Sequence, residues 1–160
     1  MPRRVVVYES GCPEEGLPAA MLEGQPYELV VCPTLRGVLE QIVGDRAGAL
    51  VFALCGAENA IPSALRLVRR AAPGLPLVLV VRDETLPVRR ELQAFNPIYC
   101  AVYPPDPHEL SEAVQAALKR SEATYARRGA RQTSARPPNR RRRDSRSRPA
   151  RARPPGRPRR

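Results

Sequence analysis

The fold is decided by residues 49–76, which read ALVFALCGAENAIPSALRLVRRAAPGLP. The apolar run over 49–54 predicts a buried strand, and apolar residues spaced three and four apart over 61–72 predict a helix. Pro73-Gly74 ends that helix, and a second apolar run over 77–81 follows at once. Strand, loop, helix and strand within this length predict a βαβ unit, whose two strands are parallel.

The same alternation continues on both sides of this unit. Further short strands are expected over 5–8, 28–32 and 99–103, and their near-continuous apolar content is typical of parallel strands covered on both faces. A helical pattern over 35–43 follows Thr34, a favourable N-cap residue. We therefore predict an α/β protein with one doubly wound, five-stranded parallel sheet.

Charge is distributed unevenly along the 160 residues, whose net charge is +11. Residues 127–160 contain 15 arginines and one acid, Asp144, so this Arg-rich segment carries +14. The preceding 126 residues contain 12 basic and 15 acidic side chains and therefore carry −3. The basic character of the chain belongs to its C-terminal segment.

The composition changes after Tyr125, where Arg, Pro, Ser, Ala and Gly dominate and large aliphatic residues are missing. Such a segment cannot bury enough apolar surface to offset its ordering entropy. We therefore predict a domain over 1–125 and a disordered Arg/Pro-rich tail over 126–160. Guanidinium groups pair bidentately with phosphate, so the predicted polyanion contacts are Arg140, Arg141, Arg142, Arg143, Arg146 and Arg148. DNA, RNA, an anionic membrane surface, an acidic protein or a merely solubilising tail all remain open.

Cysteine and apolar content argue against a metal centre and a membrane span. The four cysteines, Cys12, Cys32, Cys55 and Cys100, lie far apart and the chain has one histidine, so no zinc site or other metal is expected. Buried, reduced thiols are the simpler interpretation. No apolar segment approaches the roughly 20 residues of a membrane helix, and no cofactor is expected. A cytoplasmic protein is the prediction.

Two local motifs carry a resemblance to a known family. The stretch 75–80, Leu-Pro-Leu-Val-Leu-Val, resembles the fourth strand of the CheY-like receiver domains of bacterial response regulators. The stretch 103–110, Tyr-Pro-Pro-Asp-Pro-His-Glu-Leu, resembles that family's Lys-Pro-x-Asp-Pro-x-Glu-Leu turn into the last helix. The resemblance covers residues 3–120 and implies a flavodoxin-like fold with strand order 2-1-3-4-5.

The residues at the family's phosphorylation site are largely replaced. Receivers transfer a phosphoryl group onto an Asp beside a Mg²⁺ ion, with a Lys and a Ser or Thr nearby. The resemblance places the acid pair on Tyr8 and Glu9, the acceptor on Ala53, the hydroxyl on Val81 and the Lys on Tyr103. One carboxylate supplies too few oxygen ligands for Mg²⁺. We therefore expect a degenerate pseudo-receiver that is not phosphorylated, in which Glu9 is a solvated acid at a strand end.

The resemblance implies function through surfaces, because receivers make partner and dimer contacts through the fourth helix, fifth strand and fifth helix. Here that face would include Arg89, Arg90, Tyr99, Tyr103, His108 and Glu109. An alternative for Tyr103 is that it only fills the space of the missing Lys. An enzyme is not expected, because the strand ends offer no nucleophile beside a base.

The expected function is therefore a non-catalytic, phosphorylation-independent signalling module that acts by protein–protein interaction. Its tail would contact a polyanion, and the domain could form a homodimer. The alternative is a nucleic-acid-associated regulator in which the tail is the primary binding element.

Overall fold

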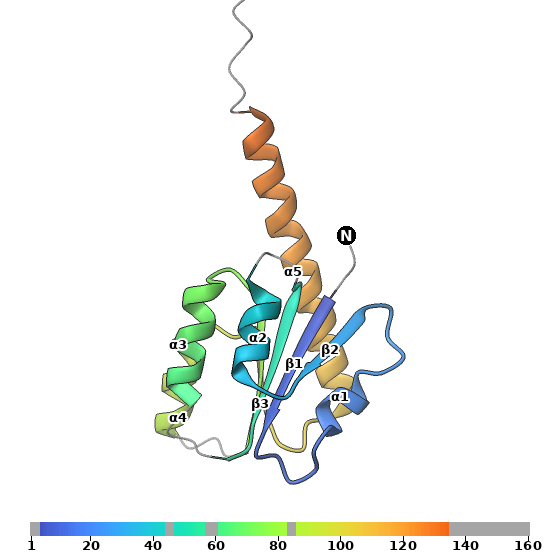
Figure 1. Ribbon diagram of the computed structural model, residues 1–160, viewed down its shortest axis with the longest axis vertical. Coiled ribbons are helices and arrows are strands. Elements are labelled where there is room, and N and C mark those ends of the chain that lie inside the picture. Colours follow the sequence, from blue (N-terminus) through green and yellow to red (C-terminus); the bar gives the residue numbers. More distant parts are fainter. Residues whose placement is uncertain (1–3, 44–46, 57–60, 83–85, 135–160) are drawn as a thin grey trace, which may run out of the picture.

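The computed structural model describes residues 4–43, 47–56, 61–82 and 86–134. Strands and helices alternate along the chain (Figure 1). The strands are β1 (Arg4–Ser10), β2 (Glu28–Cys32), β3 (Ala49–Leu54), β4 (Leu77–Val81) and β5 (Tyr99–Val102). The helices are α1 (Leu17–Met21), α2 (Leu35–Ile42), α3 (Ile61–Ala71), α4 (Leu86–Gln93) and α5 (Pro107–Ser134).

All strand pairs are parallel, and the order across the sheet is β2-β1-β3-β4-β5. This confirms the predicted fold class and strand order. Strand β3 lies in the middle of the sheet, and Ala49–Leu54 is buried except for its last residue, which is partly buried. Its apolar residues do not alternate with polar ones because helices cover both of its faces.

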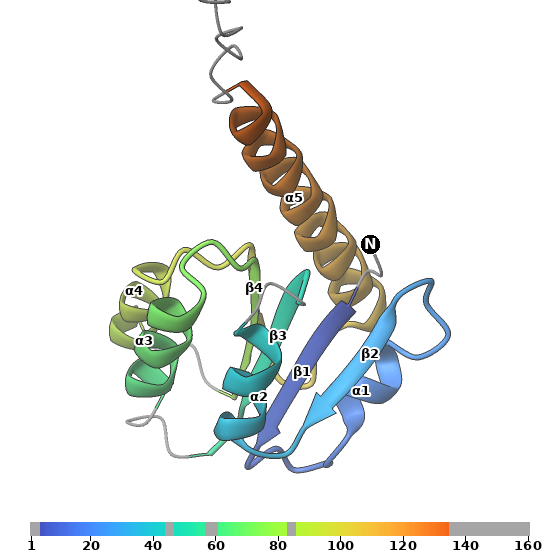
Figure 2. The same ribbon diagram turned by 45° about the horizontal axis from the view of Figure 1, so that its top comes forward.

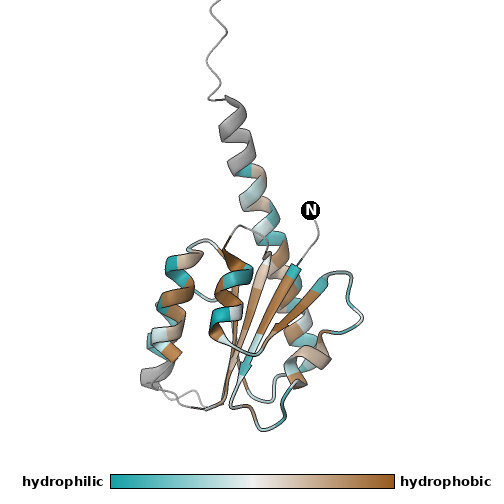
Figure 3. Ribbon diagram, in the orientation of Figure 1, coloured by the Kyte–Doolittle hydropathy of each residue, from teal (hydrophilic) through white to brown (hydrophobic). Residues whose placement is uncertain are grey.

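Helices α1 and α5 cover one face of the sheet, and α2, α3 and α4 cover the other (Figure 2). Because neighbouring side chains on a strand point to opposite faces, Val5 and Val7 join the core under α1 and α5. Val6 lies between them in sequence and packs with Phe52 under α2 and α3. Figure 3 shows the result, apolar strands flanked by helices with hydrophilic bands.

Side-chain caps fix two helix starts that the sequence predicts. The Thr34 Oγ1 accepts a hydrogen bond from the Gly37 N–H at 3.1 Å at the start of α2. The Asp106 Oδ1 accepts from the N–H groups of His108 at 2.9 Å and Glu109 at 3.0 Å at the start of α5. Both side chains satisfy donors that a helix leaves unpaired at its first turn.

Helix α5 continues into the segment for which the sequence predicts a disordered tail. The expected domain boundary after Tyr125 falls inside it, because the helix continues to Ser134 and extends beyond the sheet (Figure 1). Ala, Arg and Gln favour helix, and the first proline in this region is Pro137. The six arginines proposed as polyanion contacts lie in 135–160, outside the described residues.

None of the helices in the described ranges is long and apolar enough to cross a lipid bilayer.

Candidate functional site

The candidate site lies where the carboxyl ends of β1, β3 and β4 meet, the edge at which α/β sheets bind ligands. Glu9 pairs with Ala53 across β1 and β3, and Ala53 pairs with Val80 on β4. Beyond the strands, the Cys55 N–H donates to the Ser10 carbonyl at 3.0 Å. The loops that follow β1 and β3 are thereby held side by side.

Glu9 is the single acid that the resemblance retains, and its carboxylate is occupied by backbone donors. Oε2 accepts from the Gly16 N–H at 2.6 Å, and Oε1 accepts from the Ala19 N–H at 2.9 Å. The carboxylate therefore caps the amino end of α1, where the helix dipole also favours negative charge. The expectation of a solvated acid is wrong, because Glu9 is half-buried and holds a helix in place.

Replacing Glu9 by Ala is expected to lower the free energy of unfolding by about 1–3 kcal/mol, because two part-buried N–H groups lose a charged acceptor. Glu9→Gln keeps one acceptor oxygen and should lose less. Urea unfolding measures the effect, and hydrogen exchange of the Gly16 and Ala19 amides locates it. The exposed Glu15 of the same loop is the control, and an equal loss in Glu15→Ala would contradict the capping role.

Ala53 is fully buried and belongs to the core under α1 and α5. Tyr8 and Val81 lie on the opposite face, in the core under α2, α3 and α4. The Tyr8 ring packs against Phe52 with ring centroids 4.9 Å apart. The structure thus brings Glu9, Ala53 and Tyr103 to one face of the sheet and places Tyr8 and Val81 on the other.

Tyr103 follows β5 and binds the loop between β1 and α1. Its hydroxyl accepts from the Glu14 N–H at 3.2 Å and donates to the Glu14 carbonyl at 3.3 Å. The following peptide bond, Tyr103-Pro104, is cis. At the position that the resemblance assigns to a Lys, the side chain connects two loops instead of leaving a charged group at the site.

Two cysteine side chains, Cys12 and Cys55, meet under these loops and are hydrogen-bonded to each other. Burial raises the pKa of both thiols, and burial together with the Cys12 hydrogen bond raises the pKa of Cys55 to about 12. Both groups are therefore protonated at neutral pH, and a protonated thiol is a poor nucleophile and metal ligand. In the part of the chain that the structure describes, no three His, Cys, Asp or Glu residues form a metal-binding group.

The predicted interaction face is brought together only in part. The Tyr99 hydroxyl donates to Oε2 of Glu109, which joins β5 to the first turn of α5. Three residues further along β5, the Val102 side chain is 47% exposed and lies on the other face of the sheet from Tyr99, although the sequence pattern did not single it out. Arg90 and His108 are exposed, and His108 Nδ1 lies 3.8 Å from Oε2 of Glu112. Tyr103 is instead engaged with the loop between β1 and α1.

The hydrogen bond to Glu109 raises the pKa of Tyr99 from 10.0 to about 12, with burial adding to it. A raised pKa in the folded state favours the protonated phenol, so this stabilisation is complete below pH 10 and is lost as the pH rises to about 12. An NMR titration of the Tyr99 ring carbons measures it. Glu109→Gln should return the pKa toward 10, and an unchanged value would contradict the assignment.

Comparison with known proteins finds solved structures of similar fold but no matching sequence. No family model matches the chain, and no curated protein sequence matches it. A CheY-like response regulator receiver domain from Methanospirillum hungatei superposes with a TM-score of 0.66 at 16% identity, covering 78% of this chain and 99% of the other.

Two further receivers superpose similarly. The signal receiver domain of an HD domain-containing protein from Pseudomonas fluorescens gives a TM-score of 0.65 at 16% identity, over 77% of this chain and 99% of the other. The chemotaxis response regulator CheY4 of Vibrio cholerae gives a TM-score of 0.60 at 15% identity, over 74% of this chain and 100% of the other. The domain described here therefore has the fold of response-regulator receiver domains.

Proposed function

We propose that this chain is a receiver-like signalling module that acts by protein–protein contact and does not accept a phosphoryl group. The observation that carries the proposal is the state of Glu9, whose two carboxylate oxygens cap α1. The buried methyl group of Ala53, at the position that the resemblance assigns to the acceptor, offers no nucleophile.

Phosphoryl transfer to a carboxylate needs a nucleophile and a divalent cation held by several oxygens. Releasing Glu9 to a cation would leave the Gly16 and Ala19 amides unpaired at the amino end of α1. A Lys would have to replace the contact that Tyr103 makes with Glu14. The proposal therefore assigns these three side chains to holding loops together, and it assigns the function to the surface.

The surface proposed for partner contact lies over α4, β5 and the start of α5. It follows the edge strand β5, with Val102 and Arg90 on the side of α4 and with Tyr99 and Glu109 on the side of α5. An exposed aliphatic side chain, a tyrosine and charged groups along one edge of a sheet form a composition found at protein interfaces. A second copy of the chain could use the same surface for a homodimer.

Val102→Asp is the test of this surface, and Leu67→Asp on α3 is its matched control because Leu67 is 46% exposed. Cross-linking pull-downs should recover the same partner with the wild-type chain and Leu67→Asp, and lose it with Val102→Asp. Sedimentation of the three proteins separates self-association from binding another protein. If Val102→Asp retains its partner and its oligomeric state, the contact does not lie on this surface.

The Arg-rich segment is proposed to bind a polyanion, with nucleic acid as the alternative primary function of the chain. Helix α5 favours this because its last residues, 127–134, belong to that segment and extend beyond the sheet (Figure 1). Each phosphate contact would add about −0.9 to the slope of log binding constant against log salt.

Truncation after Ala126 should abolish salt-sensitive nucleic-acid binding. A full-length control replaces Arg140, Arg141, Arg142, Arg143, Arg146 and Arg148 by Gln and should lower the salt slope without changing chain length. Binding that survives truncation would assign the polyanion contact to the folded domain.

A further inference from the structure

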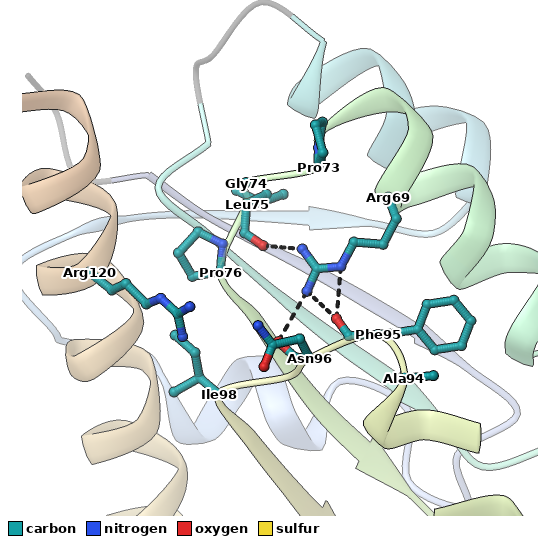
Figure 4. A pocket seen from close by; sticks show the side chains of 10 residues that line it. All are labelled: Arg69, Pro73, Gly74, Leu75, Pro76, Ala94, Phe95, Asn96, Ile98 and Arg120. Carbon is teal, nitrogen blue, oxygen red and sulfur yellow. Dashed lines mark hydrogen bonds between the residues drawn. The ribbon is translucent and has the colours of Figure 1, made fainter. Parts of the chain in front are cut away.

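A pocket opens at the edge of the sheet opposite to Glu9 and Ala53. It has a volume of about 270 Å³ and lies where the chain enters β4 and β5, beside α5 (Figure 4). Its walls come from the loop over 73–76, the turn over 94–98 and two arginines, Arg69 on α3 and Arg120 on α5. This volume suits a small ligand, because pockets for drug-sized ligands begin at about 300 Å³.

Arg69 is fixed in position by carbonyl groups, and among the described residues no acidic side chain forms an ion pair with it. Its guanidinium donates to the Phe95 carbonyl at 2.6 and 2.9 Å, to the Leu75 carbonyl at 2.6 Å and to the Asn96 carbonyl at 3.3 Å. Four of its five N–H groups are thereby used, and one N–H on Nη1 remains. Carbonyls are neutral, and no acidic side chain is among the residues that line the pocket.

Arg120 places a second positive charge at the same pocket. Figure 4 shows its guanidinium across the cavity from Arg69, with the Asn96 side chain between them. Burial lowers the pKa of Arg69, and the nearby charge of Arg120 lowers it further because two cations repel each other. The helix neighbours of Arg120 at three and four positions are Ala116, Ala117, Ala123 and Thr124, so none of them neutralises it.

We propose that this pocket binds a phosphate group, with Arg120 as its principal contact and Arg69 and Asn96 as supporting donors. A dianion between two guanidinium groups would relieve their repulsion, and the planar fork of Arg120 can donate two parallel hydrogen bonds to phosphate oxygens. Pro76 and Ile98 provide apolar wall beside it, so the phosphate of a small organic molecule fits better than a bare ion.

This proposal is independent of the proposed signalling function, because no residue of the pocket belongs to the partner surface or to the site around Glu9. The phosphate could belong to a small monoester or to a nucleic-acid strand that also contacts the Arg-rich segment. Both ligands would present the same phosphate group to the pocket, but the strand would also make contacts with the Arg-rich segment.

The test is an amide NMR titration of the ¹⁵N-labelled full chain at constant ionic strength, with inorganic phosphate, glycerol phosphate and a short oligonucleotide as separate probes. Saturable shifts are expected at Gly74, Leu75, Asn96 and Ile98. Arg120→Ala should weaken phosphate binding at least tenfold, and Arg120→Lys should recover part of it. Lys119→Ala removes an exposed charge next to Arg120 on the same helix, outside the pocket lining, and should leave binding at the pocket unchanged.

The three probes separate the two sources. If glycerol phosphate shifts the pocket amides, the ligand is a small monoester; if only the oligonucleotide does, it is a strand, and in both cases Arg120→Ala must weaken binding. Shifts that equal those produced by chloride, that survive Arg120→Ala, or that are confined to the Arg-rich segment would overturn the proposal. The amide spectrum of each variant away from the pocket shows whether its fold is intact.

Discussion

Arg69→Ala is expected to lower the free energy of unfolding by about 2–3 kcal/mol, because one side chain joins three segments of the fold. Its guanidinium reaches from α3 to the Leu75 carbonyl before β4 and to the Phe95 and Asn96 carbonyls after α4. Without it, carbonyls at the pocket lose a charged donor, and the ends of three elements lose their common contact.

Urea unfolding provides the measurement, and Arg66→Ala provides the control on the same helix. The Arg66 side chain is 65% exposed, and its Nη2 lies 3.7 Å from Oε1 of Glu91. Removing this exposed ion pair should lower the free energy of unfolding by about 0–1 kcal/mol. Arg69→Lys retains the charge but lacks the fork, and its stability should fall between that of Arg69→Ala and that of the wild type. Equal losses in Arg69→Ala and Arg66→Ala would show that Arg69 does not join these segments.

Gly11→Ala is expected to destabilise the protein by about 2–4 kcal/mol. The backbone conformation at this position is unfavourable for alanine, and the added methyl group has no space. Gly11 has φ of +67°, and a Cβ there would lie 2.9 Å from the Cα and N atoms of Gly56. Both neighbours are backbone atoms, so the loops after β1 and β3 would have to separate.

Gly24→Ala is the matched control, because Gly24 has φ of +75° and nothing within 4 Å of its Cβ position. This variant should show the backbone cost alone, about 1 kcal/mol. The difference in unfolding free energy between the two variants isolates the contact of the two loops. Amide shifts at Cys55 and Gly56 in Gly11→Ala would locate it, and equal stability of the two variants would contradict it.

Elements that depend on local sequence were predicted well. Strands β3 and β4 begin and end where their apolar runs do, and Thr34 caps α2 as expected. These features depend on residues adjacent in sequence, so periodicity and capping chemistry are enough to find them. The end of α5 at Ser134 was not predicted. The composition after Tyr125 indicates that the segment cannot form a packed core, but a helix can continue beyond the core without being packed.

Contacts between distant segments were not predicted. Glu9 binds the amide of Gly16, a glycine with φ of +81° at the start of a five-residue helix, and such an irregular start has no sequence pattern. Arg69 was counted only as part of a helix, because its acceptors at Phe95 and Asn96 lie 26 and 27 residues away. The Cys12–Cys55 contact could have been inferred, since both follow neighbouring strands at the same edge of the sheet.

The central claim is that the edge around Glu9 and Ala53 does not take up a phosphoryl group. Its most direct test treats the full chain with acetyl phosphate and Mg²⁺, and follows intact mass together with the amide signals of Gly11, Ala53 and Cys55. A receiver domain with its acceptor Asp serves as the positive control. We predict no added phosphoryl group and no saturable shift at these amides. A Mg²⁺-dependent phosphoryl group recovered on Glu9 or on any Asp would contradict the account.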